Sequence, residues 1–432
     1  MSTYELGHQP WHIASPAARL GEAGHDVRAL DLAVEPWRDS DFDWAEAVGF
    51  SVPMHTAMRL AVEGAVRVRK SHPGLPIAFY GLYAAVSCDR VVGALADLVI
   101  AGEYENELVE WVTGPSRSSR PVVVDIGRMN FLKPARDRLP PLESYAHLQW
   151  QGSHRLVGYV EGSHGCRHRC RHCPIPSVYD GRYRVVGLES VLADIDQLVE
   201  MGAEHITMGD PDFLNAPPYS RELLTAAHRR HPQLTFDVTV KVEHVLAHEK
   251  IWSEWRELGV IFVVSAFETT NDRILAMLDK GHTTVEAARA VEILREAGIE
   301  VRPSWMPFTP WTEPDDLPSI FRFLDDNQLF ENVDPVQMTI RLLAPEGSLL
   351  VERFPSDFDH YDARLLTYQW RPQHPATGEL ADELARIAEA ASANGEDSVG
   401  TLESMWSTCE DRPVSATRRG VTPPRLTEPW FC

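Results

Sequence analysis

The chain has 432 residues and a mass of 48.6 kDa, more than one hydrophobic core usually serves, so we expect two or three domains. Its 63 acidic and 41 basic residues leave a net charge of -22, which argues against a nucleic-acid or anionic-membrane partner because both require positive surface. The sequence has no run of about 18 apolar residues and no signal-peptide pattern, and 6 cysteines are too few for a disulfide framework. These features predict a cytoplasmic protein.

Residues 1–115 alternate short apolar runs with segments of helical period, which predicts a doubly wound, Rossmann-like α/β domain. The predicted strands are 27–32, 47–52, 76–82 and 96–101, and the predicted helices are 15–24, 55–71 and 103–113. Such a domain opens with an apolar strand, and residues 1–9 offer almost none. We expect either a start upstream of Met1 or a unit that begins with a loop and a helix.

Two motifs in this domain resemble those of the cobalamin-binding Rossmann-like family. They are Gly24-His25-Asp26-Val27, at the entry to the predicted strand 27–32, and Gly102-Glu103-Tyr104-Glu105, after the predicted strand 96–101. The family's cobalt-ligating Asp-x-His-x-x-Gly pattern is absent from these residues, so any cobalamin would bind without that histidine. His55 lies in a strand-to-helix loop, where ligands of open α/β sheets gather, although loop histidines are commonly solvated. Cobalamin binding is left open at this point.

The next segment, residues 116–150, is irregular and punctuated by prolines, and we interpret it as a linker. A second α/β domain is predicted for residues 151–345. Its predicted strands are 156–161, 205–209, 234–240, 260–266, 300–305 and 336–342, with an amphipathic helix at 188–202 and further helical segments between the strands. Six βα units indicate a full or partial (β/α)6 barrel.

Three cysteines, Cys166, Cys170 and Cys173, fall within eight residues of the loop that follows the first strand of this domain. Barrel enzymes carry their chemistry on loops at the carboxyl ends of the strands. Thiolates bind iron in clusters, and three thiolates leave one iron of a cubane open to a ligand. The pattern therefore predicts an iron–sulfur cluster with an open iron.

Two other interpretations of the same loop stay open. A zinc-stabilised binding module is one, because three histidines lie among the cysteines and a Cys3His site is acceptable to zinc. An iron–sulfur electron-transfer or regulatory protein is the other. A nucleic-acid reader built on the arginines of the loop is disfavoured by the overall acidity. The side chains concerned are His164, His168, His172, Arg167, Arg169 and Arg171.

The spacing Cys-x-x-x-Cys-x-x-Cys at the end of the first barrel strand resembles the signature of the radical S-adenosylmethionine (radical SAM) superfamily. The resemblance implies a [4Fe-4S] cluster whose open iron is chelated by SAM. One-electron reduction, by a flavodoxin or ferredoxin, would cleave SAM to methionine and a 5′-deoxyadenosyl radical that takes hydrogen from a small-molecule or peptide substrate. His172 takes the place of the usual aromatic residue before the last cysteine and would lie beside the adenine.

Two further segments resemble the SAM-binding motifs of this superfamily. Gly209 and Asp210 occupy the place of its Gly-Gly-Glu-Pro segment, where backbone and carboxylate meet the SAM amino group. Ser265 and Glu268 resemble its Gly-x-Glu-Ser segment and would bind the ribose or carboxylate of SAM. An ordinary turn and a helix cap are the alternatives for these two segments. Lys241, at the end of the third strand, is expected at the surface.

Residues 346–432 are predicted to be an extension with a helix at 379–392 and irregular polar sequence from Asn394 onward. The chain ends in Trp430-Phe431-Cys432, which resembles the tails of the CUAEP/CCAEP-tail radical SAM (seleno)proteins. If the resemblance holds, Cys432 is the first of a cysteine–selenocysteine pair and the next codon is UGA. A disordered terminus is the alternative.

Overall fold

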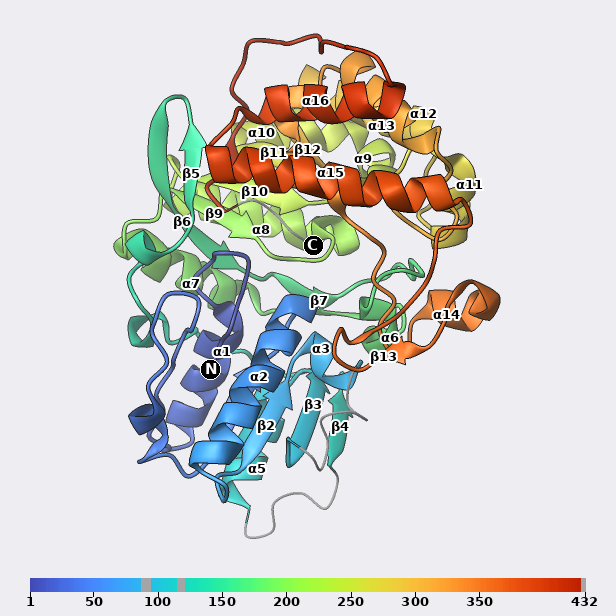
Figure 1. Cartoon of the computed structure of the whole chain (residues 1–432). Helices are drawn as coiled ribbons and strands as arrows, with labels where there is room; N and C mark the ends of the chain where they lie inside the picture. Colours follow the sequence, from blue (N-terminus) through green and yellow to red (C-terminus); the bar gives the residue numbers. More distant parts are fainter. Residues whose placement is uncertain (87–94, 115–120, 429–432) are drawn as a thin grey trace.

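Two sheets organise the computed structural model, which describes residues 1–86, 95–114 and 121–428 (Figure 1). The smaller sheet is parallel, and the larger one is parallel except at β5 (His147–Trp150) and β15 (Arg425–Leu426), which pair antiparallel at its edge. The smaller sheet has the order β1-β2-β3-β4. Its strands are β1 (Val48–Ser51), β2 (Ile77–Tyr80), β3 (Leu98–Gly102) and β4 (Val122–Asp125), and the helices around it are α1 (Trp11–Glu22), η1 (Asp39–Phe42), α2 (His55–Ser71), α3 (Leu82–Ala85) and α5 (Glu105–Thr113). Because β2 and β3 are buried along their whole length, they form unbroken apolar runs, as a parallel sheet covered on both faces requires. The predicted parallel α/β domain is confirmed.

The predicted strand 27–32 is wrong. Only Asp31 pairs there, in an isolated parallel bridge to Ser2. On the other side the amino group of Met1 donates to the Gly49 carbonyl at 2.7 Å, and the Ser51 N–H donates to the Met1 carbonyl at 2.8 Å. Residues 1 and 2 therefore separate residue 31 from β1, beside a cavity of about 540 Å³. Segment 27–32 forms no strand because residues 1–9, which lie beside it, pair with it only through this one bridge.

The predicted linker comprises residues 116–150, and its described part, residues 121–150, is more regular than its prolines suggest. It contributes β4 to the smaller sheet and β5 to the larger one, and its elements are η2 (Arg136–Arg138), η3 (Leu142–Ser144) and β5 (His147–Trp150). Arg136 is fully buried and donates to both carboxylate oxygens of Asp194, at 3.0 and 2.9 Å, and to the Gln9 carbonyl at 3.0 Å. This guanidinium joins the N-terminal segment to a helix of the second half.

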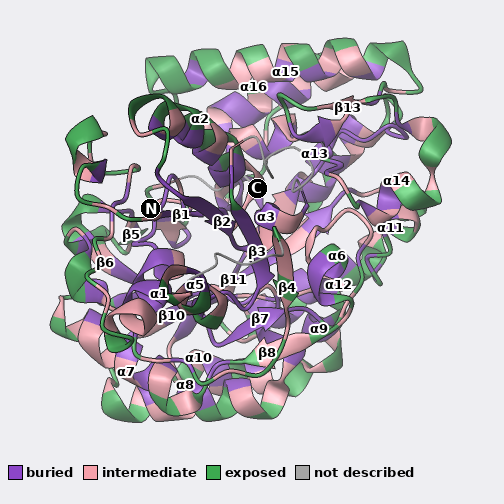
Figure 2. Cartoon of the chain, turned by 90° about the horizontal axis from the view of Figure 1, so that it is seen from below, coloured by how far each residue is buried: buried purple, intermediate pink, exposed green. Residues whose placement is uncertain are grey.

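The larger sheet has the order β12-β11-β10-β9-β6-β5-β15 and forms a curled half-barrel in which β6 to β12 run parallel. Five of the six predicted strands are confirmed. The strands are β6 (Ser153–Val160), β9 (His205–Met208), β10 (Thr235–Thr239), β11 (Val260–Glu268) and β12 (Glu300–Trp305). The helices between them are α7 (Leu188–Glu200), η4 (Phe213–Asn215), α8 (Pro217–Arg230), α9 (Val242–Ala247), η5 (Glu249–Ile251), α10 (Trp252–Glu257), α11 (Asp272–Leu278) and α12 (Thr284–Glu296). After β12 come α13 (Asp316–Asp326) and η6 (Phe330–Asn332). Figure 2 shows the buried strands enclosed by helices whose outer faces are exposed.

The sixth predicted strand, 336–342, is wrong, because most of this segment is the 3-10 helix η7 (Pro335–Thr339). Pro335 lacks the N–H that a ladder needs, and so does Pro303 in the neighbouring strand β12. The side chain of Gln337 instead accepts from the Trp305 N–H at 3.0 Å, and only Arg341 pairs, with Phe308. The sheet ends at β12 with its edge covered.

The C-terminal extension carries two long helices rather than one. The predicted helix 379–392 is confirmed within α15 (Pro375–Asn394), but the segment expected to be irregular contains α16 (Ser398–Glu410), whose N-cap Asp397 accepts from the Gly400 N–H. The two helices lie side by side over the half-barrel in Figure 1. The remaining elements are α14 (Leu349–Arg353), η8 (Pro355–Asp357), β13 (Tyr361–Asp362), β14 (Thr367–Tyr368) and β15 (Arg425–Leu426), which pairs with β5. Cys432 lies outside the described residues, and within them no helix is both long and apolar enough to cross a membrane.

Candidate functional site

The cysteine loop is clamped at both ends by a short antiparallel pair, β7 (Ser163–Gly165) and β8 (Tyr183–Val185). Gly165 has a φ of +75°, and a Cβ there would lie 2.6 Å from the Arg182 carbonyl oxygen, so only glycine fits this crossing. Midway along the loop, the Arg171 N–H donates to the Leu278 carbonyl at 2.8 Å. The loop is thus fixed to the end of α11 as well as to the first strand of the half-barrel.

The three cysteines of the loop are free thiols; Cys166 and Cys170 are buried and Cys173 is half-buried. Zn–S bonds of about 2.3 Å would place two sulfurs of a tetrahedral site about 3.8 Å apart. Within the described residues, only one group of three or more ligand atoms gathers within 4.8 Å, and it contains no cysteine. The three sulfurs are therefore not gathered into a closed single-ion site in this structure, and the choice of an iron–sulfur cluster rests on their spacing in one loop.

The histidines of the loop do not complete a zinc site with these sulfurs, because each contacts another element. His164 lies 2.8 Å from Glu103 and 3.0 Å from Glu161. His172 lies 3.1 Å from Glu268, and His168 approaches His244. A Cys3His zinc site is not formed in this arrangement.

Positive charge is built in beside the sulfurs. Burial raises the pKa of the Cys166 thiol to about 11 and that of Cys173 to about 12, whereas Lys241 opposes the shift at Cys166 and Lys280 opposes it at Cys173. The side chain of Lys241 is only 11% exposed, so the expectation of a surface lysine is wrong. Both ammonium groups would offset the negative charge of thiolates that bind iron. The sequence places Lys280 shortly after the β11 motif but gives it no role, because its position beside the sulfurs depends on the fold.

Glu268 is held in a strained position at the end of β11. The register slips between Ala266 and Glu268, where the strand pairs with β12, and Glu268 has a φ of +64°, which is rare for a residue with a side chain. Its carboxylate lies 2.9 Å from Lys280 and 3.1 Å from His172. Burial opposes ionisation, but these neighbours outweigh it and hold the pKa of Glu268 below its usual range. The bulge turns this carboxylate toward the cysteine loop.

Ser265 lies three residues earlier on β11 and is buried, and its hydroxyl has no hydrogen-bond partner among the described residues. The alternative that Ser265 or Glu268 caps a helix is wrong, because the cap of α11 is Asn271, which accepts from the N–H groups of Arg273 and Ile274. An unpartnered buried hydroxyl is suited to a ligand contact.

Asp210, after β9, is buried and already accepts from the Gly162 N–H at 2.8 Å and from the Ser163 hydroxyl at 2.6 Å. Burial raises its pKa to about 7. Gly209 is required by packing, since a Cβ there would lie 2.1 Å from the ring of Tyr159. Both residues hold the entrance of the cysteine loop, and their contacts with SAM stay a prediction.

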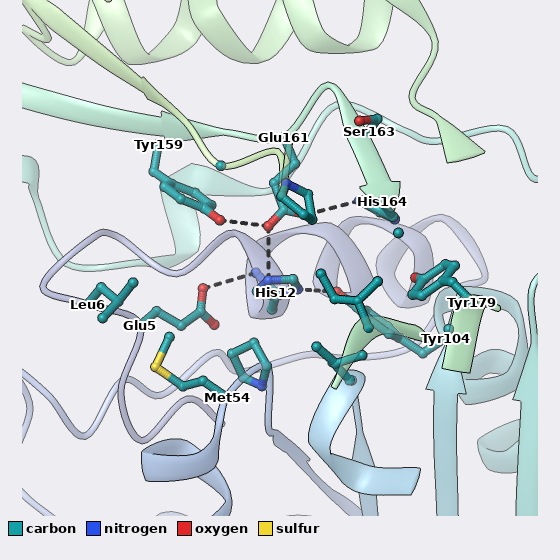
Figure 3. Close-up of a pocket in the computed structure, with 18 of the residues that line it drawn as sticks. Glu5, Leu6, His12, Met54, Tyr104, Tyr159, Glu161, Ser163, His164 and Tyr179 are labelled. Atoms are coloured by element: carbon teal, nitrogen blue, oxygen red, sulfur yellow. Dashed lines mark hydrogen bonds and ion pairs between the residues drawn. The ribbon is translucent and has the colours of Figure 1, made fainter. Parts of the chain in front are cut away.

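A cavity of about 190 Å³ lies between the two halves of the chain (Figure 3). The carboxyl ends of β1, β2 and β3 form one wall, and the start of the cysteine loop forms the other. Segment 5–12 closes one side. The polar side chains that line it are Glu5, His8, His12, Tyr104, Tyr159, Glu161, Ser163, His164 and Tyr179. His55 is not among its lining residues and contacts the Leu365 carbonyl at 2.7 Å.

Glu161 is the centre of a buried network in this cavity. Its carboxylate accepts from the Tyr159 hydroxyl at 2.7 Å and lies 3.1 Å from His12 and 3.0 Å from His164 (Figure 3). Burial opposes the charge on His12, but Glu161 and Glu5 outweigh it and raise the pKa of His12 to about 9. Sequence reasoning missed this network, because its members are far apart in the chain and follow no motif.

Three residues that line this cavity each have a buried polar atom without a hydrogen-bond partner among the described residues. The atoms are Oε1 of Glu5, Nε2 of His8 and Nε2 of His164, the last of which lies 3.0 Å from Glu161. Burial raises the pKa of Glu5 to about 7 and lowers that of His8 to about 4. Both groups are thus suited to hydrogen-bond a polar ligand.

Comparison with known proteins finds similarities both in the sequence around the cysteine loop and in the fold. The sequence profile of the radical SAM superfamily matches residues 160–324, which include the cysteine loop and strands β9 to β12. A curated relative, hopanoid C-3 methylase of Methylococcus capsulatus, is 24% identical over 315 residues. The match covers 68% of this chain, which thus spans 60% of the length of that relative.

Two solved structures share the fold at low sequence identity. The cobalamin-dependent SAM radical enzyme OxsB, with aqua-cobalamin and SAM bound, superposes with a TM-score of 0.70 at 13% identity, over 94% of this chain and 68% of that one. The radical SAM methyltransferase TsrM from Kitasatospora setae, with its tryptophan substrate and a SAM analogue bound, gives a TM-score of 0.61 at 17% identity, over 80% and 72%. Both likenesses concern the arrangement of the two sheets.

Proposed function

We propose that this chain, which belongs to the radical SAM superfamily, uses Cys166, Cys170 and Cys173 to hold a [4Fe-4S] cluster at which SAM is reductively cleaved to start radical chemistry on a substrate. One observation carries the ligand assignment: three free thiols lie on one loop whose ends are held together by the pairing of β7 with β8. When bound, the cluster supplies the electron that cleaves SAM.

The residues around the loop would prepare this site. Lys241 and Lys280 place positive charge beside the thiolates. Glu268 fixes Lys280 and His172, and the free hydroxyl of Ser265 would donate to an oxygen of SAM. Asp210 closes the entry of the loop, so its carboxylate would act mainly by holding backbone in place.

The substrate site we propose is the cavity between the two halves. Its volume of about 190 Å³ suits a small polar molecule, since pockets for drug-sized ligands measure about 300–1,000 Å³. Glu5 and His8 offer unpartnered polar atoms to such a ligand, and Glu161 with His12 and His164 forms a charged wall. We propose that the substrate carries a hydrogen-bond donor group, such as an amine or a hydroxyl, that Glu5 accepts.

We propose that this chain can bind cobalamin, which its likeness to the cobalamin-dependent enzyme OxsB supports. Glu5, His8 and His12 lie at the carboxyl ends of the smaller sheet, and residues 1–115 contain no Asp-x-His-x-x-Gly pattern. Cobalamin would therefore bind without that histidine, and segment 5–12 would have to move away to admit it. Hydroxocobalamin added to the reconstituted protein should co-elute with it stoichiometrically in gel filtration, and protein that elutes without cobalamin would contradict this proposal.

One anaerobic experiment tests the main proposal. The protein is reconstituted with iron and sulfide, reduced with dithionite and mixed with SAM, and 5′-deoxyadenosine is measured. Release of 5′-deoxyadenosine is expected. A cluster whose electron paramagnetic resonance spectrum ignores SAM would favour the electron-transfer alternative, and colourless protein with one zinc would favour the zinc module.

Three finer proposals rest on the sequence alone. We propose a cytoplasmic location, a flavodoxin or ferredoxin as the electron donor, and membership of the CUAEP/CCAEP-tail family. The last is supported by the Trp-Phe-Cys ending, and the nucleotide sequence after the Cys432 codon tests it. A codon other than UGA, or one not followed by Ala-Glu-Pro, would remove it.

A further inference from the structure

A second group of metal-ligating side chains lies beside the cysteine loop and takes no part in the function proposed above. It consists of His168, Asp212 and His244. His168 belongs to the loop itself, Asp212 follows β9, and His244 lies in α9 after β10. One ligand atom of each residue lies within 4.8 Å of the other two. Folding alone brings these residues together, at the carboxyl ends of three neighbouring strands.

The two innermost atoms of this group lack hydrogen-bond partners. Oδ2 of Asp212 and Nδ1 of His244 are 2.8 Å apart, yet the ring N–H is not aimed at the oxygen, and neither atom has a hydrogen bond to any described residue. The side chain of Asp212 is fully buried and that of His244 is 9% exposed. Unpartnered polar atoms this deeply buried are costly unless something satisfies them.

The third ligand lies within reach of the other two. Nε2 of His168 is 3.9 Å from Oδ2 of Asp212, and its ligand atom lies within 4.8 Å of that of His244. Its contact at 3.2 Å is with Nε2 of His244, the ring nitrogen that does not face Asp212, and would give way when Nε2 of His168 binds the ion. The carboxylate of Asp212 is held in place through its other oxygen, which accepts from the Leu214 N–H at 3.0 Å. Glu243 lies 3.7 Å from Nδ1 of His168, where a carboxylate could orient a metal-bound imidazole.

A simple hydrogen-bonded relay from Asp212 through His244 to His168 is the competing explanation. It accounts for the contact between the two imidazoles, which is a hydrogen bond. It does not account for the contact between Asp212 and His244, because their short separation lacks hydrogen-bond direction. A cation bound by the lone pairs of Asp212 Oδ2 and His244 Nδ1 explains their short separation, because it requires no N–H directed at the oxygen.

We infer that His168, Asp212 and His244 bind a divalent transition-metal ion, such as Zn²⁺ or Fe²⁺, next to the cysteine loop. Two imidazoles and one carboxylate suit such ions, and three protein ligands leave positions for water. The ion ties the cysteine loop to the ends of β9 and β10. Its binding does not depend on SAM or on the iron–sulfur cluster.

The test uses the full chain with Cys166, Cys170 and Cys173 all replaced by Ala, so that neither a cluster nor a thiolate site forms. After dialysis against Zn²⁺ and desalting, mass spectrometry should find one tightly bound zinc per chain. In the same background, Asp212→Asn and His244→Gln should each weaken zinc binding at least about tenfold. His154→Ala, which removes an exposed histidine on β6, should change nothing.

Zinc that is absent from the triple variant, or retained at equal affinity after Asp212→Asn, would overturn the inference. Asp212→Asn keeps the oxygen that caps η4, and circular dichroism checks that each variant is folded. The reconstituted wild-type protein gives a second measurement that does not need the triple variant. It should hold one zinc in addition to the iron of the cluster, and Asp212→Asn should lose the zinc while keeping the iron. A cluster that fails to form would affect the function proposed above but not the zinc count of the triple variant.

Discussion

At the scale of single residues, the site depends on a few side chains that burial makes unusually sensitive. The cysteines are buried or half-buried thiols beside the ammonium groups of Lys241 and Lys280, and Glu268, whose backbone is strained, forms an ion pair with Lys280. When one member of such a buried ion pair is replaced, the charge of the other member stays buried without a counter-charge, which destabilises the folded state.

Cys173→Ala should abolish the cluster. A [4Fe-4S] cluster with only two protein thiolates is not held, so iron should fall from about four atoms per chain to near zero after desalting. Iron analysis and the visible absorption of the reconstituted protein measure this. Cys409→Ala is the matched control, because Cys409 is also a free thiol but lies on α16, outside the loop, and full iron in the Cys173 variant would contradict the ligand assignment.

Glu268→Gln should destabilise the protein by about 3–5 kcal/mol, the range for removing one partner of a buried ion pair. The side chains of Glu268 and Lys280 are 9% and 5% exposed, so the ammonium left behind is not solvated. Urea unfolding measures the loss. Replacing both residues, Glu268→Gln with Lys280→Met, should recover part of it, and equal losses in the single and double variants would show that the pair is not coupled.

Gly209→Ala should cost about 1–3 kcal/mol through overpacking, because the new Cβ would lie 2.1 Å from the ring of Tyr159. The ring cannot simply move, since its hydroxyl donates to Glu161. A double-mutant cycle with Gly209→Ala and Tyr159→Ala, measured by urea unfolding, gives the free-energy cost of the contact between the new Cβ and the Tyr159 ring. A coupling of zero between the two changes would mean that the ring is not the obstacle.

At the scale of elements, apolar runs predicted the strands of both sheets well, because a parallel strand buried on both faces must be apolar along its length. The errors have local causes. Segment 336–342 has several apolar residues but directly follows Pro335, the first residue of η7, and it lies beside β12, which contains Pro303, so it forms most of η7 instead of a sixth strand. Residues 398–410 are polar on one face, which hid the helix α16 among loop-like sequence.

The cysteine loop is the element for which sequence was most informative. Its spacing and its place after a strand predicted the chemistry, and the profile match over residues 160–324 agrees with it. The ligand roles of Gly209, Asp210, Ser265, Glu268 and His172 stay predictions. The bulge that turns Glu268 inward, and the clamp of β7 on β8, depend on pairing with other strands and could not be predicted.

At the scale of the whole molecule, the two halves meet through a network of charges. His12 precedes the smaller sheet and Glu161 follows the first strand of the half-barrel, so their contact at 3.1 Å crosses the boundary. Arg136 crosses it in a second place. The cavity lies on this boundary, so we expect its shape to depend on how firmly the halves are joined.

This contact predicts how stability depends on pH. The pKa of His12 is raised to about 9, so the folded state holds a proton that the unfolded state loses near its usual pKa of about 6.5. The resulting stability is fully present below about pH 6.5 and is lost as the pH rises through 9. Urea unfolding should show that the free energy of unfolding of the wild type falls between pH 6.5 and 9, and that it falls less steeply in His12→Gln. An equal pH dependence in the two proteins would contradict the role of His12.

The sequence by itself determined the two α/β units and the cluster chemistry, because apolar periodicity and cysteine spacing act over a few residues and need no distant partner. Only the tertiary structure decided the cavity around Glu161 and the group of His168, Asp212 and His244. Their members are tens of residues apart in the chain. They meet because parallel strands bring their carboxyl ends to one edge, and burial there fixes which polar atoms are left without partners.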